Sequence, residues 1–165
     1  MRPSGLCVLL LGGAVEALGA EDALADVLRA DGVVAVEPAR LSYRAQGRLP
    51  AELADALATL QARRLLRVLP ATPAAVVVTE PLQYPLARGL LAVVDGCELW
   101  YARGERPPGV SARMLRRLAA LEEQASRRAA LTFPRDGDTA PLWERLRDLG
   151  VDIRVSARGA SRSAP

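Results

Sequence analysis

Short, uninterrupted apolar runs of strand length are the feature that most constrains the fold of this chain. The clearest are residues 6–11, Leu-Cys-Val-Leu-Leu-Leu, and residues 74–79, Ala-Ala-Val-Val-Val-Thr. A strand of this kind has no polar side, so both faces of its sheet must be covered. A segment with helical spacing separates most of these runs from the next, which is typical of parallel strands joined by helical crossovers.

The alternation predicts an α/β fold: a doubly wound, mostly parallel sheet of five or six strands with helices on both faces, Rossmann-like and a single domain. The expected strands cover 6–11, 33–36, 74–79, 97–101, 129–133 and, as a sixth, 151–155. The expected helices cover 21–30, a segment that opens at Pro50, 84–94, 111–128 with Ser111 as its cap, and 142–149. Leu53, Leu57, Leu60 and Leu65 mark the expected buried stripe of the helix that opens at Pro50. Residues 1–155 form the expected domain, and the Ser, Ala, Arg and Gly of 156–165 indicate a disordered tail.

Composition excludes several classes of chemistry. The chain has 165 residues, which suits one domain, and it contains neither His nor Lys. Serine–histidine and cysteine–histidine catalysis, histidine metal sites, Schiff bases and the phosphate-loop lysine are therefore ruled out. Cys7 and Cys97 lie in apolar runs and are expected to be buried free thiols in a reducing cytoplasm. We expect no metal and no cofactor.

The expected partners are limited as well. The formal net charge of +3, with all 22 basic residues being arginine, gives no dense basic patch with interleaved aromatics, so we expect no nucleic-acid partner. The longest early apolar run, 6–11, is far shorter than the roughly 20 residues that span a bilayer. We therefore expect a cytoplasmic protein without a membrane span.

A parallel sheet predicts where a ligand binds, because ligands lie outside the carboxyl ends of the strands where the strand order switches. Gly12 and Gly13 follow the first strand and either form a tight turn or let a phosphate approach the backbone. Residues 79–85, Thr-Glu-Pro-Leu-Gln-Tyr-Pro, follow the third strand. Their prolines either hold Glu80 and Tyr84 for a ligand, or the segment simply caps a helix.

The fourth strand ends in a second candidate segment. Residues 98–106, Glu-Leu-Trp-Tyr-Ala-Arg-Gly-Glu-Arg, place Arg103, Glu105 and Arg106 on a loop rich in glycine and proline. An arginine there suits a phosphate or carboxylate. The alternative is a tryptophan packed under a loop that carries a solvated ion pair.

Residues 76–88 and 98–106 resemble the N-terminal half of bacterial GT-B glycosyltransferases, which carry a similar acidic-Pro-x-Gln-Tyr-Pro-Leu-Ala-Arg run and a Leu-Trp-Tyr strand. The resemblance covers roughly 6–133 and is pronounced over 74–133. It implies an acceptor-side lobe in which Glu80 or Glu105 acts as the catalytic base. It also implies that Gly12 and Gly13 lie at the donor edge, and that Tyr84 and Arg106 line the acceptor side with the two glutamates. Together with the candidates at the strand ends, the expected substrate-binding residues are Gly12, Gly13, Gln83, Tyr84, Tyr101, Arg103 and Arg106.

The donor domain of that family is missing from the sequence, so the resemblance implies a fragment, a truncated remnant or one subunit of a split enzyme. Such a lobe would be incomplete or inactive alone and would need a donor-domain chain. A sugar or nucleotide-sugar would be its substrate. The alternative function is a non-catalytic α/β module that binds a small anionic ligand or a protein partner, including a second copy. Trp100, Tyr101 and Trp143 are the residues expected at such an interface.

Overall fold

The protein is described by a computed structural model that covers residues 7–11, 33–36, 48–69, 71–104, 108–134, 138 and 140–150. Within these ranges, five strands form one sheet: β1 (Cys7–Leu11), β2 (Val33–Val36), β3 (Pro73–Val78), β4 (Glu98–Arg103) and β5 (Leu131–Pro134). Their order is β2-β1-β3-β4-β5, and every neighbouring pair is parallel. The predicted α/β class with a parallel sheet is confirmed. The predicted strand at 151–155, the helix at 21–30 and the tail lie outside the described residues.

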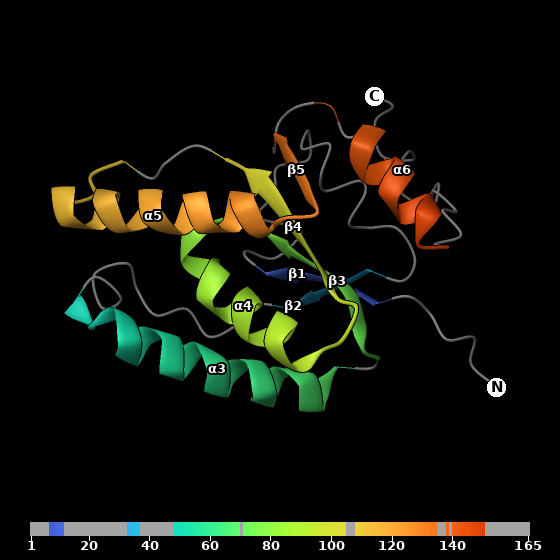
Figure 1. Ribbon diagram of the computed structural model, residues 1–165, viewed down its shortest axis with the longest axis horizontal. Coiled ribbons are helices and arrows are strands. Elements are labelled where there is room, and N and C mark those ends of the chain that lie inside the picture. The colour runs from blue at the N-terminus through green and yellow to red at the C-terminus, as the bar shows by residue number, and fades with distance from the viewer. Residues whose placement is uncertain are drawn as a thin grey trace, which may run out of the picture.

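From β2 onward, helices alternate with the described strands. They are α3 (Ala51–Val68), the 3-10 turn η2 (Pro81–Gln83), α4 (Tyr84–Val93), α5 (Ala112–Arg128) and α6 (Ala140–Asp148). The Ser111 hydroxyl accepts a hydrogen bond from the Met114 amide and caps α5 as predicted. Figure 1 shows α3, α4 and α5 beside one another, with α6 apart from them.

The side chains of β3 and β4 divide between the two faces of the sheet. Val76, Val78, Leu99 and Tyr101 join one core cluster with buried residues of α3, α4 and α5. Successive side chains of a strand point to opposite faces, so Glu98, Trp100 and their alternate neighbours point away from that cluster. An ion pair between Glu98 and Arg145 of α6 places α6 at this second face.

The prediction of a buried leucine stripe on α3 is wrong for three of its four residues. Leu53, Leu57 and Leu60 are 49%, 37% and 54% exposed, and of the four leucines expected inside only Leu65 is buried. The buried face of α3 is instead built on small residues, Ala58 and Ala62, which let the helix approach α4 closely.

No helix in the described part of the chain is long and apolar enough to cross a membrane.

Candidate functional site

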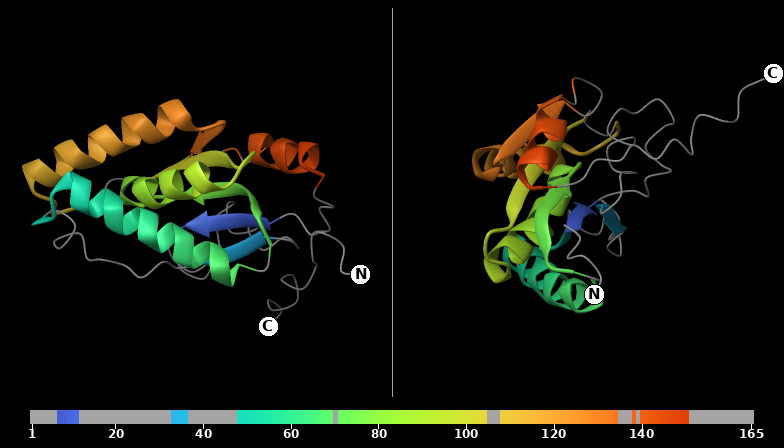
Figure 2. Two further views of the ribbon diagram at one scale, coloured as in Figure 1. Left: turned by 60° about the horizontal axis from the view of Figure 1, so that its bottom comes forward. Right: turned by 90° about the vertical axis from the view of Figure 1, so that its right-hand side faces the viewer.

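The carboxyl edge of the sheet contains the point at which the strand order switches. β1 lies between β2 and β3, and Leu11 at the end of β1 pairs in register with Val78 at the end of β3. The chain leaves these two neighbouring ends in opposite directions across the sheet, which opens a crevice in folds of this kind. In Figure 2, β1 points toward the end of the molecule at which α3 and α5 begin. The residues that follow Leu11 and Val78 are therefore the best placed to meet a ligand.

The segment after β3 forms a tightly hydrogen-bonded turn. The Gln83 side-chain oxygen accepts the backbone N–H groups of Thr79 at 3.0 Å and Glu80 at 3.3 Å. The Glu80 side chain in turn accepts a backbone N–H at position 83, which completes a capping box around η2. The helix-cap interpretation and the ligand-site interpretation of residues 79–85 are therefore compatible, because the cap itself holds Glu80 at the switch point.

The side chains of Gln83 and Glu80 have different roles in this turn. The oxygen of Gln83 is already used by the turn, so its role is to hold the loop. Glu80 is half-buried, and an ionised carboxylate has about four acceptor positions. Glu80 thus presents a carboxylate at the switch point and takes part in the capping box as well.

The aromatic candidates do not face a crevice. Tyr84 is 5% exposed and Tyr101 2% exposed, and both belong to the core cluster beneath α3, α4 and α5. Trp100 is fully buried on the opposite face of the sheet, while Trp143 is half-buried in α6. The structure therefore gives Tyr84, Tyr101 and Trp100 packing roles, and the expected aromatic interface is not formed by Trp100 or Tyr101.

Arg103 is exposed at the end of β4, the strand that pairs with β3 in the register Val78 to Tyr101. It lines a shallow groove of about 470 Å³ with one side of α5, including Glu122, Glu123 and Ser126. Among the described residues, Arg103 thus shares this groove with the two carboxylates and with Arg127. The remaining predicted site residues, Gly12, Gly13, Glu105 and Arg106, lie outside the described residues.

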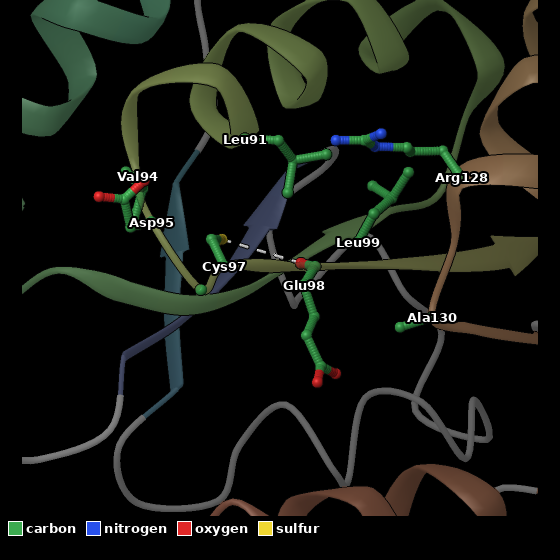
Figure 3. Close-up of a pocket in the computed structure, with 9 residues that line it drawn as sticks. Leu91, Val94, Asp95, Cys97, Glu98, Leu99, Arg128 and Ala130 are labelled. Carbon is green, nitrogen blue, oxygen red and sulfur yellow. Dashed lines mark hydrogen bonds between the residues drawn. The ribbon is translucent and has the colours of Figure 1, made fainter.

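A second hollow, of about 290 Å³, lies at the amino edge of the sheet (Figure 3). Asp95, Cys97 and Arg128 contribute to its lining, and Figure 3 shows the Glu98 carboxylate turned away from Leu91 and Arg128. The Cys97 thiol donates to the Glu98 carbonyl at 3.8 Å and is half-buried rather than buried as expected. This hollow is at the edge opposite the switch point, where parallel sheets do not usually bind ligands.

The Glu98–Arg145 contact was missed at the sequence level because its partners are 47 residues apart. Arg145 donates two hydrogen bonds to the Glu98 carboxylate, one of them from Nε at 2.9 Å, and the Trp100 indole donates a third at 3.0 Å. The hydrogen bonds from Arg145 hold the pKa of Glu98 below its usual range, against the opposing effect of burial, and raise the pKa of Arg145. The contact joins α6 to the start of β4 and has a structural role.

No metal-binding group of three or more His, Cys, Asp or Glu side chains occurs among the described residues.

Comparison with known proteins gives little more. No protein family matches the sequence, and no curated protein matches it. A solved structure, the A-PCP didomain of a carboxylic acid reductase from Segniliparus rugosus in complex with AMP, overlaps 81% of this chain at 14% identity and a TM-score of 0.35. The chain spans 16% of the length of that protein. A likeness this weak carries no argument about function.

Proposed function

We propose that this chain is a ligand-binding α/β lobe that works as the acceptor side of a glycosyltransferase of the GT-B type. A donor-binding lobe on a second chain would complete the site. The observation that carries the proposal is the register of Leu11 with Val78, because it sets the Glu80 turn beside the end of β1 at the switch in strand order.

Glu80 would act as general base in such a site. The acceptor hydroxyl attacks the anomeric carbon of an activated sugar, and its proton passes to the Glu80 carboxylate as the new glycosidic bond forms. The bond from the sugar to the nucleotide breaks, and the nucleoside diphosphate leaves with the bonding electron pair. Gln83 positions this carboxylate by accepting the backbone amides of Thr79 and Glu80.

The test is sugar transfer by the full chain mixed with nucleotide-sugars and with a candidate donor-lobe chain from the same source. We expect turnover only with both chains present. Glu80→Gln retains a capping oxygen but cannot take a proton, so it should lower kcat by about 10²–10⁴-fold. Glu123→Gln, on the exposed side of α5, is the matched control and should leave kcat unchanged. Transfer in no combination, or transfer unaffected by Glu80→Gln, would contradict the proposal.

A second candidate function is a non-catalytic module that binds a protein partner. The observation that favours it is the row of exposed leucines on α3, since large exposed apolar patches mark interaction surfaces. A cytoplasmic location fits both functions and remains a prediction.

A further inference from the structure

One side of α3 carries exposed leucines that do not belong to the core cluster of the described residues. The α3 leucine stripe consists of Leu53, Leu57 and Leu60, which are 49%, 37% and 54% exposed. Their spacing of four and three residues puts them on one face of the helix. The other face of α3, with Ala58 and Ala62, packs against α4. Figures 1 and 2 place α3 at the outer margin of the described elements, in agreement with the exposure of the stripe.

The charges beside this stripe are arranged by sign along the helix. Glu52 lies in the first turn of α3, whereas Arg63, Arg64 and Arg67 lie near its end, and all four side chains are exposed. Glu52 and Arg63 are 11 residues apart, which is just over three full turns at 3.6 residues per turn. They therefore flank the leucine stripe on the same side, the acid at one end and the base at the other.

We propose that the α3 leucine stripe is a self-association surface that binds a second copy of this chain, with the two α3 helices antiparallel. In this arrangement Leu57 packs against the partner's Leu60 and Leu60 against the partner's Leu57. The same flanks of two antiparallel helices face each other, so Glu52 lies opposite the partner's Arg63 at both ends of the contact. The interface is thus self-complementary in shape and charge, as a twofold dimer requires.

The arginines exclude the parallel alternative. Two parallel copies would place Arg64, which interrupts the apolar row after Leu60, directly against the partner's Arg64. Like charges placed against each other across an interface disfavour it. The antiparallel arrangement instead puts Arg64 near the partner's Leu53, where its aliphatic stem can cover apolar surface while its guanidinium stays in water.

The contact is small. An 18-residue helix is about 27 Å long, and a pairing of two such helices is at the low end of specific interfaces. We therefore expect a dimer with a dissociation constant in the range of roughly 1–100 μM. The proposal does not depend on the glycosyltransferase function, because the stripe contains none of the residues placed at the switch point; it names the partner for the second candidate function.

Sedimentation equilibrium of the full chain tests the proposal. We expect a concentration-dependent dimer whose dissociation constant rises at least about tenfold in Leu60→Glu, since this change buries a carboxylate against the partner's Leu57. The side chain is already half-exposed, so the monomer should keep its fold, which circular dichroism checks. Leu115→Glu is the matched control, because Leu115 is a 36%-exposed leucine on α5 and should leave dimerisation unchanged.

Exchanging the charges of Glu52 and Arg63 distinguishes the antiparallel arrangement from other dimers. Glu52→Arg and Arg63→Glu should each weaken the dimer several-fold, and the double variant should restore it, because the pair is re-formed with its signs exchanged. A chain that stays monomeric at several hundred micromolar would overturn the proposal. So would a dimer that is indifferent to Leu60→Glu, or a double variant no stronger than the single ones.

Discussion

Gln83 is the residue on which the geometry of the candidate site most depends. Its side-chain oxygen accepts hydrogen bonds from the backbone amides of Thr79 and Glu80, and Thr79 is only 7% exposed. Gln83→Ala removes this acceptor from a largely buried amide, which costs about 1–3 kcal/mol in the free energy of unfolding. Urea denaturation measures the loss.

Gln124→Ala is the control for this prediction, because Gln124 is an exposed glutamine within α5. We expect its free energy of unfolding to stay within about 0.5 kcal/mol of the native value. Equal losses in the free energy of unfolding of the two variants would mean that the hydrogen bonds to the Gln83 oxygen do not stabilise the fold.

Glu98 gives stability a dependence on pH. The hydrogen bonds from Arg145 lower its pKa in the folded chain, while the unfolded chain keeps a value of about 4.3. The stabilisation from this carboxylate is therefore fully present above the unfolded value and is lost as pH falls through the lower, folded pKa. Glu98→Gln should be less stable than the native chain at pH 7, and the difference should shrink toward pH 3, measured by urea denaturation at each pH.

Glu123→Gln is the matched control for the pH series. Glu123 pairs with Arg127 one turn along α5, but both side chains are more than half exposed, so water and salt screen the contact. We expect no comparable pH dependence in its effect. A Glu98→Gln difference that is constant from pH 7 to pH 3 would show that the ionised carboxylate does not stabilise the fold.

Residue roles were harder to predict than residue positions. The sequence placed Glu80 and Gln83 at the end of β3 correctly, because the apolar run and the following prolines mark that boundary. It did not reveal that Tyr84 and Tyr101 are buried, since an aromatic residue near a strand end is equally compatible with a crevice and with a core. The Glu98–Arg145 pair depends on tertiary packing and leaves no local signal.

At the scale of the elements, the contact of α3 with α4 depends on a glycine. A Cβ atom at Gly89 would lie 3.1 Å from the Ala62 Cβ and 3.3 Å from the Thr59 Cα, both of them rigidly placed on α3. Alanine gains about 1 kcal/mol in helix propensity over glycine, but overpacking costs about 1–3 kcal/mol. We expect Gly89→Ala to lower the free energy of unfolding by up to about 2 kcal/mol, measured by thermal or urea denaturation.

Ala92→Gly calibrates the propensity part of this prediction, because Ala92 is exposed on the same helix. It should cost about 1 kcal/mol. If Gly89→Ala instead stabilises the chain by that amount, the two helices are not in close contact at Gly89.

The elements themselves were largely predictable, whereas the orientation of α3 was not. Strand boundaries agree with the apolar runs to within a few residues, since runs of this kind can only be covered strands. In α3, leucines occur on more than one side of the helix, and hydrophobicity alone favours the leucine-rich face. The helix buries its alanines instead, because small side chains permit the close approach to α4 that Gly89 also requires.

At the scale of the whole molecule, the two edges of the sheet are alternative places for a ligand. Parallel strands point all their carboxyl ends one way, and the order β2-β1-β3-β4-β5 puts the switch between β1 and β3 at that edge. The hollow beside Cys97 and Arg128 lies at the opposite edge. A nucleoside diphosphate is a probe that both edges could accommodate, so it distinguishes them.

We expect a nucleoside diphosphate, added to the isotopically labelled chain, to shift the backbone amide signals of Leu11, Thr79 and Glu80 in NMR spectra and to leave those of Gly96 and Cys97 in place. The Thr79 and Glu80 amides already donate to Gln83, so we expect their signals to shift because the phosphate charge lies close to them at the carboxyl edge. The starts of α3 and α5 lie toward the same edge, and helix N-termini favour an anion. Shifts confined to Gly96 and Cys97 would move the site to the amino edge. The glycosyltransferase proposal would then fail together with the role assigned to Glu80, while the antiparallel dimer through α3 would stand.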